Sequence, residues 1–194
     1  LLKNRVKDQL TRFRIESEDC VGIFGAIEKI DSKSKRIGVV NDKKESLYCY
    51  YDILYHRHNL PACTQMIRTD VLRTVGGYPD NIIIEDWYMW LKLTEADKYL
   101  LSIPVPFSKY RTHDKNTSSD VGMMHKERLK ILKLSDWSIT EKERELAISA
   151  CYLASAIEAQ SFLDKIDYIW RSISISARII LERKFYIALF RLFF

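Results

Sequence analysis

The chain has 194 residues, of which 47% are hydrophobic and 29% charged, and its formal net charge is +5. This length suits one domain, or one domain with a small appendage, and the apolar content supports a packed core, which excludes wholesale disorder. The basic residues are spread along the chain without an arginine-rich arm, so nucleic-acid binding is not indicated. The modest positive charge is compatible with a phosphate-bearing substrate or an anionic membrane surface.

The four cysteines and the start of the sequence give indications about the compartment and about the extent of the chain. No two of the cysteines form a Cys-x-x-Cys pair, and scattered thiols fit a reducing environment. No signal peptide is visible, and no run of about 18 apolar residues predicts a membrane span. The first residue is not Met, so we expect the chain to be a piece of a longer protein.

The first part of the chain alternates helical and strand patterns. The hydrophobic spacing and the turn residues predict, in chain order, an amphipathic helix over 1–15 with Leu2, Val6, Leu10 and Phe13 on its apolar face, strands over 20–31 and 36–40, a tyrosine-rich helix over 44–60 and a buried strand over 62–68. Next come a short helix over 69–77 that stops at Gly76 and Gly77, and a turn over 78–81. A helix is expected to begin at Glu85 and Asp86.

The next segment, 99–113, is expected to be extended, because Pro104 and Pro106 forbid a helix, and 114–120 is expected to be a polar loop. Strand patterns cease after about residue 120. An apolar stripe at helical spacing follows within 143–160, and at least two further helical stretches come after it. The sequence therefore predicts an α/β part over 1–118 and a helical tail over 119–194.

Glu85 and Asp86 lie side by side between Ile84 and Trp87 and have two interpretations. Carboxylates at a helix start accept hydrogen bonds from free backbone N–H groups and meet the positive end of the helix dipole. A capping box is incomplete, however, since Met89 stands three residues after Asp86. The alternative is a general base at the end of a strand, held by a rigid helix and walled by aromatic side chains.

Two other motifs also have both a functional and a structural interpretation. In an extended segment, Arg111 and His113 point to one side and Tyr110 to the other. A guanidinium beside an imidazole could contact a phosphate or a metal-bound phosphate, or the two residues could bond a loop and a surface acid. Trp87 and Trp90, three apart on a helix, are core residues or a platform for a sugar ring.

Taken in order, these segments resemble the C-terminal half of family-2 glycosyltransferases with the GT-A fold. The resemblance runs from residue 1 to about 119 and depends chiefly on two motifs, MIRTDVLRTVGGYPDNIIIEDWYMWLKL and VPFSKYRTHDKNTS. It implies a partial GT-A domain, Rossmann-like with a mixed sheet, followed by the helical tail. It also implies transfer of a sugar from a nucleotide-sugar donor to a hydroxyl of a saccharide or lipid-linked acceptor, with inversion, in surface-polysaccharide biosynthesis of the cell envelope.

The resemblance also implies roles for individual residues. Asp86 matches the catalytic base, and Glu85 and Trp87 match neighbours on the acceptor side. Thr64 and Gln65, at the end of the ACTQM segment, are implied to face the donor sugar or the acceptor. Finally, Arg111 and His113 match residues near the donor phosphates, and His113 matches a histidine that reaches the divalent metal ion in some members.

The chain departs from the family pattern in one large respect. The nucleotide-binding half is absent, and no Asp-x-Asp stands in the sequence to hold the Mg²⁺ or Mn²⁺ expected for the intact enzyme. The chain is then either a fragment, inactive without its N-terminal half, or a truncated relative that binds an acceptor or a partner without catalysis. The family resemblance places the protein in the cytoplasm, with peripheral attachment to the inner face of the cell membrane.

The tail segment RIILERKFYIALFRLFF, residues 178–194, mixes cationic with large apolar residues. This composition suits a helix lying in a membrane interface, where apolar side chains enter the lipid and cations meet anionic headgroups. The alternative is a terminal helix docked on the α/β part with its apolar face in the core.

Overall fold

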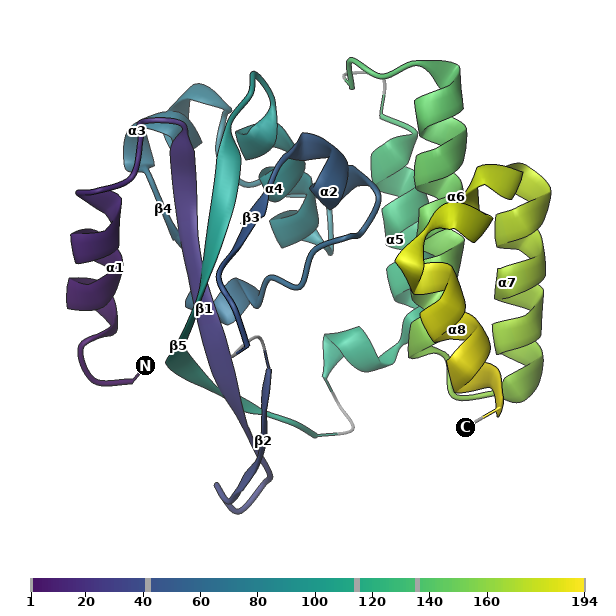
Figure 1. The fold of residues 1–194 in the computed structure, drawn as a ribbon, viewed down its shortest axis with the longest axis horizontal. Helices are drawn as coiled ribbons and strands as arrows, with labels where there is room; N and C mark the ends of the chain where they lie inside the picture. The colour runs from purple at the N-terminus through teal and green to yellow at the C-terminus, as the bar shows by residue number, and fades with distance from the viewer. Residues whose placement is uncertain (1, 41–42, 114–115, 135–136, 194) are drawn as a thin grey trace. The chain divides into compact units, whose positions relative to one another are not determined.

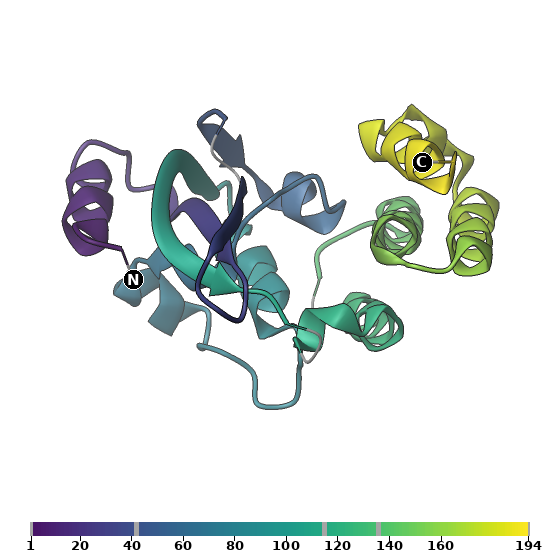
Figure 2. The ribbon, with the colours of Figure 1, turned by 90° about the horizontal axis from the view of Figure 1, so that it is seen from below.

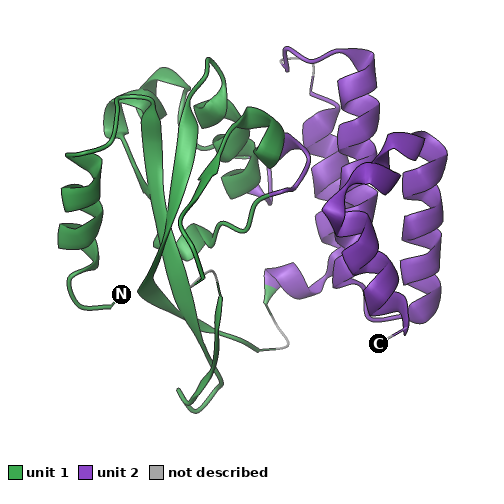
Figure 3. Cartoon of the chain, in the orientation of Figure 1, with its two compact units in different colours: residues 1–53, 58–80, 85–116 green, residues 54–57, 81–84, 117–194 purple. Residues whose placement is uncertain are grey.

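The computed structural model describes residues 2–40, 43–113, 116–134 and 137–193. The chain forms two compact units (Figure 3). Unit 1 comprises residues 1–53, 58–80 and 85–116, and unit 2 comprises 54–57, 81–84 and 117–194. The main division after 116 lies two residues before the boundary expected from the sequence, but two short segments of the N-terminal part, 54–57 and 81–84, belong to the helical unit.

Unit 1 is a mixed α/β structure built on a curled five-stranded sheet (Figure 1). Its strands are β1 (Cys20–Ile30), β2 (Arg36–Val40), β3 (Ser46–Tyr48), β4 (Met66–Ile67) and β5 (Tyr99–Arg111). The strand order is β2-β1-β5-β3, and β4 pairs with β1 as well. Only the central pair, β1 and β5, is parallel, and the other pairings are antiparallel. The fold class of mixed α/β with C-terminal helices is thus confirmed.

The core of the sheet follows from the nearly unbroken apolar run of β1. A strand buried on both faces needs such a run, and β1 is buried from Cys20 through Ile27. Ile23 on β1 packs with Leu101 and Phe107 on β5 in the buried cluster. Gly25 permits this close approach, because a Cβ there would lie 2.2 Å from Phe107 Cδ2 and 2.5 Å from the carbonyl oxygen of Val105.

The helices of unit 1 are α1 (Arg5–Phe13), α2 (Tyr50–Leu54, whose last residue belongs to unit 2), the 3₁₀ turn η1 (Ala62–Thr64), α3 (Thr69–Thr74) and α4 (Glu85–Thr94). The predicted helix over 69–77 and the helix start at Glu85 are confirmed. Gly76 and Gly77 both have positive φ, which lets the chain leave α3 without strain. The strands predicted over 20–31 and 36–40 and the extended segment 99–113 are confirmed too.

Three sequence predictions for unit 1 need correction. Segment 44–60 is not one helix, because it starts with β3 and only Tyr50–Leu54 is helical. Segment 62–68 is not one strand, because it begins with the turn η1 and only two of its residues lie in β4. The helix near the N-terminus exists, but Val6 and Leu10 are exposed and the buried residue of α1 is Gln9. The first residue of the predicted helix lies outside the described residues, as do positions 114 and 115 of the predicted loop.

Unit 2 consists of helices, which are η2 (Thr117–Ser119), α5 (Val121–Leu132), α6 (Glu141–Glu158), α7 (Phe162–Ile175), η3 (Ala177–Leu181) and α8 (Arg183–Phe193). At the starts of α5, α6 and α7, a side chain accepts a hydrogen bond from a free backbone N–H group. Thr140 and Glu143 form a complete capping box at the start of α6. Helix α6 packs against α5, α7 and α8, and Figure 2 shows it nearly end-on between α5 and the other two. Among the described residues, no helix is both long and apolar enough to cross a membrane.

A polar cluster lies inside this helical unit. Arg128 on α5 is 6% exposed and donates two hydrogen bonds to the Glu158 carboxylate, at 2.7 and 2.8 Å, and one of 3.2 Å to Ser155 Oγ. The ring of His125 bonds the same hydroxyl at 2.9 Å. Burial and the positive charge of Arg128 lower the pKa of His125 from about 6.5 to about 4. The cluster therefore stabilises a neutral imidazole beside a partly buried ion pair.

Candidate functional site

Asp86 lines a pocket of about 330 Å³ that lies entirely within unit 1. We call it the Asp86 pocket, and its wall is formed by Ile27, Lys29, Val40, Asn59, Pro61, Ala62, Cys63, Asp86 and Tyr110. The lining combines an apolar surface with an amine, an amide, a carboxylate and a phenol. Such a mixture suits a small polar ligand that is oriented by a few hydrogen bonds.

The helix start places the Asp86 carboxylate at the pocket wall. Asp86 is the second residue of α4 and is half-buried. Its Oδ1 accepts a hydrogen bond of 2.7 Å from the backbone N–H of Trp87, so part of the helix-capping interpretation also holds. The pocket lining shows that helix capping does not remove the carboxylate from contact with a ligand space.

Two neighbouring strands bring a second pair of polar residues to the pocket. Lys29 on β1 and Tyr110 on β5 are partners in the parallel register. Tyr110 accepts a hydrogen bond of 2.8 Å from the side-chain amide of Asn116, which orients its hydroxyl. Lys29 adds a positive charge to the same wall as Asp86. The wall therefore offers both an acid–base group and donors for a ligand hydroxyl.

Helix α1 holds the segment 61–65, whose first three residues line the pocket. Arg5 donates hydrogen bonds to the carbonyl oxygens of Cys63 at 2.8 Å and Gln65 at 2.9 Å. Gln9, which is fully buried, donates to the carbonyl oxygen of Thr64 at 2.7 Å. Ser108 Oγ also donates to the carbonyl oxygen of Cys63, at 2.9 Å, and these bonds together fix the position of the segment.

Two residues near Asp86, Tyr78 and Cys63, have raised pKa values. Burial is the main reason that the pKa of Tyr78 is raised; the hydrogen bond from Gln65 opposes the rise, and the charges of Asp86 and Glu85 add to it. The negative charges at the start of α4 are therefore felt by a neighbouring phenol. Burial also raises the pKa of the Cys63 thiol, although Arg5 opposes this, so Cys63 is a neutral wall residue rather than an activated nucleophile.

The residues predicted on the acceptor side differ in their exposure to solvent. Glu85 is exposed at the first position of α4, whereas Trp87 is only 2% exposed and donates from Nε1 to the carbonyl oxygen of Ile53 at 3.0 Å. The Thr64 hydroxyl is buried, 3.1 Å from the amide nitrogen of Gly25. Gln65 links two aromatic residues, since it accepts from Trp90 Nε1 and donates to the Tyr78 hydroxyl. Of this set, only Glu85 is substantially exposed, and their roles in acceptor binding stay predictions.

Arg111 and His113 lie at the end of β5. The Arg111 guanidinium donates to the carbonyl oxygens of Asp31 at 2.7 Å and Ser32 at 3.1 Å, in the turn between β1 and β2. His113 is exposed, and its backbone N–H donates to Asn116 Oδ1. Within the described residues, no group of three or more His, Cys, Asp or Glu side chains is placed to hold a metal ion. His113 therefore offers one ligand, and the described residues do not fit a divalent-ion site.

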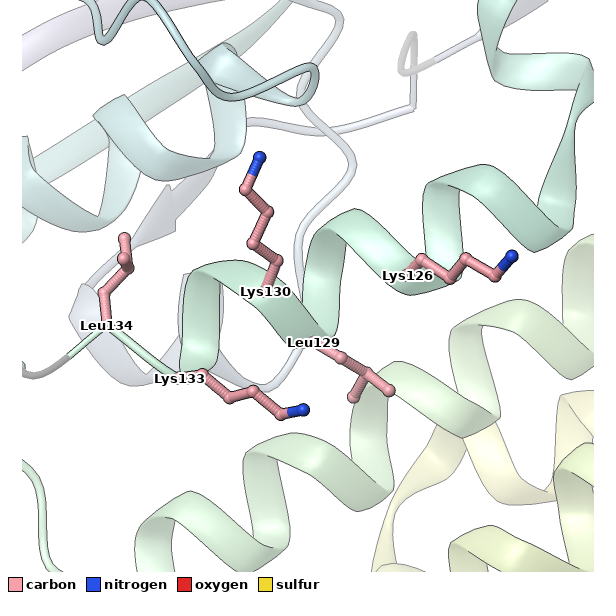
Figure 4. Close-up of a pocket in the computed structure, with 5 residues that line it drawn as sticks. All are labelled: Lys126, Leu129, Lys130, Lys133 and Leu134. Carbon is pink, nitrogen blue, oxygen red and sulfur yellow. The ribbon is translucent and has the colours of Figure 1, made fainter.

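A second, larger pocket of about 520 Å³ lies on α5 in unit 2 (Figure 4). Its walls are formed by Lys126, Leu129, Lys130, Lys133 and Leu134. In Figure 4, the side chain of Lys130 points away from that of Lys133. The Lys130 ammonium donates to the carbonyl oxygen of Asn81 at 2.6 Å. The lining consists of lysine and leucine side chains and includes no carboxylate or imidazole that could transfer a proton. The Asp86 pocket, although smaller, is therefore the better candidate for chemistry.

Comparison of the chain with protein-family models, with curated proteins and with solved structures finds no match. The functional assignment therefore depends on the geometry of the Asp86 pocket and on the motifs in the sequence.

Several pocket residues were not identified from the sequence. The alternation along β5 had separated Tyr110 from Arg111, and the Tyr110 side turns out to line the pocket. That alternation was a usable signal, although it could not show which side faces the cavity. Lys29, Asn59 and the bonds made by Arg5 and Gln9 gave no local signal, because their partners lie far away in the chain.

Proposed function

We propose that unit 1 is the acceptor-side half of a GT-A-type glycosyltransferase, in which Asp86 removes the proton from an acceptor hydroxyl bound in the Asp86 pocket. The observation that carries the proposal is the position of this half-buried carboxylate at the wall of a pocket that also presents Asn59 and Tyr110. A volume of about 330 Å³ lies at the lower end of the range of small-molecule sites, which suits one end of a saccharide.

The proposed step is a single displacement. The acceptor oxygen forms a bond to the anomeric carbon of the nucleotide sugar while its proton passes to the Asp86 carboxylate. The bond between that carbon and the diphosphate oxygen breaks, and its electron pair leaves with the nucleoside diphosphate. One base and one displacement give inversion at the anomeric carbon. Lys29 and Tyr110 would orient the acceptor by hydrogen bonds while Asp86 accepts its proton.

The exposed side of α1 supports the idea that another part of the domain completes the enzyme. Val6 and Leu10 are 53% and 47% exposed although they form the apolar stripe of an amphipathic helix. Such a stripe is usually covered. We propose that a nucleotide-binding half, with the Asp-x-Asp that this sequence lacks, packs there and holds the donor with its Mg²⁺ or Mn²⁺.

The first test measures acceptor binding to the chain alone. A panel of methyl glycosides and disaccharides is titrated into the labelled protein, and backbone amide shifts are recorded. We expect saturable shifts confined to the residues around 27–29, 59–63, 86 and 110. Asp86→Asn should weaken binding and keep the fold, whereas Asp80→Asn, which removes an exposed acid outside the pocket, should bind like the wild type. Shifts that avoid the pocket would exclude it as the acceptor site.

The second test separates catalysis from binding. The protein, together with any N-terminal half encoded upstream of it, is incubated with radiolabelled UDP- and GDP-sugars and an acceptor that binds. We expect transfer that falls by about 10²-fold or more in Asp86→Asn, while Asp80→Asn retains it. Equal turnover in the Asp86 variant would refute the base assignment. Acceptor binding without any transfer would favour the alternative function, a non-catalytic acceptor-binding module.

A further inference from the structure

Helices α7 and α8 leave large apolar side chains exposed on unit 2. On α7 the exposed residues are Phe162, Leu163, Ile166 and Trp170, and on α8 they are Tyr186, Phe190 and Phe193. At about 100° per residue, the α7 set covers an arc of about 100° and the α8 set an arc of about 60°. Each helix therefore has one continuous apolar face, and we call the two together the α7–α8 face.

The same helices bury a different side against the rest of unit 2. Phe185 and Ala188 of α8 and Ile169 of α7 are nearly inaccessible to solvent. The docked-helix interpretation placed the tail on the α/β part, whereas α8 packs on α6, α7 and η3 within its own unit and keeps its other side exposed. Some apolar residues of these helices therefore pack inside unit 2, whereas others stay exposed, and internal packing does not explain the exposed ones.

The two apolar faces belong to adjacent helices. Helices α7 and α8 pack against each other, and Lys165 Nζ donates to the carbonyl oxygen of Arg191 at 2.7 Å. This bond ties the first turn of α7 to the last turn of α8. Phe162 and Ile166, on either side of Lys165 in sequence, are thereby brought close to the end of α8 that carries Phe190.

The charges near this face favour an anionic partner. Residues 161–193 contain six basic and three acidic residues, a surplus of three positive charges. Two of the acids are engaged by arginines, Asp167 by Arg171 and Glu182 by Arg57. Arg178 and Arg183 are exposed, and Arg183 lies three residues before Tyr186 on α8, about 60° from it around the helix. In a symmetric dimer the same cations would meet each other, which disfavours a second copy as the occupant.

We propose that the α7–α8 face binds the surface of an anionic membrane, with the aromatic and aliphatic side chains at the level of the headgroups and acyl-chain ends and the arginines on the lipid phosphates. Tryptophan, tyrosine and phenylalanine with flanking cations are the composition that favours this interface. Neither helix spans the bilayer, in agreement with the lengths of the described helices. The inference does not depend on the proposed sugar transfer, because it uses no residue of the Asp86 pocket.

The tryptophans provide a direct test. Trp87, Trp90 and Trp137 are 2–4% exposed, whereas Trp170 is 69% exposed, so a change in emission on vesicle binding reports on α7. We expect a blue shift with vesicles of equal phosphatidylglycerol and phosphatidylcholine, and quenching by brominated lipid. Binding to pure phosphatidylcholine should be weaker by at least about fivefold. Arg183→Gln should weaken binding to anionic vesicles by about fivefold.

A matched pair of variants locates the face. Leu163→Glu with Phe190→Glu should weaken vesicle binding by about tenfold or more, since both side chains would otherwise enter the lipid. Ile15→Glu with Ile37→Glu changes two exposed apolar residues of unit 1 by the same charge and should bind normally. Substitution is preferable to removal of 178–194, because α8 also supplies the buried Phe185.

The proposal is overturned by any of three results. The first is an unchanged Trp170 emission and no quenching with anionic vesicles. The second is an equal loss of binding in the two pairs of variants. The third is a dimer, seen by light scattering, that the Leu163 and Phe190 substitutions dissociate while the wild type binds no vesicles, because the face would then join two copies of the chain.

Discussion

The side-chain amide of Gln9 donates a hydrogen bond of 2.7 Å to the carbonyl oxygen of Thr64, a residue 55 positions later in the chain. The same nitrogen lies 2.8 Å from the carbonyl oxygen of Ile23 on β1. One buried amide thus joins α1, the central strand and the turn that forms a wall of the Asp86 pocket. An apolar residue at this helical position would remove the side-chain donor from both backbone acceptors.

Gln9→Leu should therefore destabilise unit 1 by about 2–4 kcal/mol, because each buried carbonyl that loses its donor costs about 1–3 kcal/mol. Urea unfolding, followed by amide exchange of β1, measures the effect. Gln160→Leu, which replaces an exposed glutamine at the end of α6, serves as the control and should change stability by less than about 0.5 kcal/mol. An unchanged stability in the Gln9 variant would show that the amide does not hold the turn.

Gly25→Ala should also destabilise unit 1, by about 1–3 kcal/mol or more. The new Cβ would meet the Phe107 ring and the backbone oxygen of Val105 at distances far below ordinary contact. Gly38→Ala is the matched control, since nothing lies within 4 Å of a Cβ there. Thermal unfolding of the two variants should separate them clearly, and equal melting temperatures would contradict the packing described here.

The low pKa of His125 predicts an acid-sensitive helical unit. The folded-state pKa of about 4 lies below the ordinary value of about 6.5, so the unfolded chain binds more protons between these pH values. The contribution of the neutral imidazole is present above about pH 6.5 and is lost as the pH falls toward 4, by about 2–3 kcal/mol in all. His125→Asn should flatten this part of the stability profile of unit 2. His113→Asn, the same substitution at an exposed position of unit 1, is the control variant.

Lys184 is a residue whose substitution should stabilise unit 2 rather than destabilise it. Burial lowers the pKa of its ammonium from about 10.5 to about 8, although the charge of Glu158 opposes the shift. The charged form is thus disfavoured in the folded state, and the cost is full below about pH 8 and disappears as the pH rises to about 10.5. Lys184→Met should stabilise unit 2 by about 1–3 kcal/mol at pH 7 and by little at pH 10.5. Lys7→Met, the same substitution on the exposed side of α1, is the control variant.

Local patterns in the sequence predicted the elements whose residues carry their own signals. The apolar run of β1, the glycines that end α3 and the prolines that keep 99–113 extended were all interpreted correctly. Segments 44–60 and 62–68 were not, because short apolar or aromatic runs fit a strand, a helix or a turn equally well until their hydrogen-bond partners are known.

The candidate site was partly visible in the sequence. The pair of acids before Trp87 indicated the position of Asp86, and the structure places this carboxylate at a pocket wall. The other members of the pocket come from strands and a turn that meet only after folding. Trp170 and the exposed side of α7 likewise could not be distinguished from core positions, since an amphipathic pattern does not show whether the molecule itself covers the apolar side.

The sequence by itself determined the α/β order of the first part, the helical nature of the second and the acidic start of α4, because these depend on residues close together in the chain. Only the tertiary structure decided that Gln9 rather than Leu10 faces inward, that Lys29 and Tyr110 share a wall with Asp86, and that α7 and α8 keep apolar faces exposed. The physical reason is that burial and hydrogen bonding are satisfied between segments far apart in sequence, and those pairings exist only once the chain has folded.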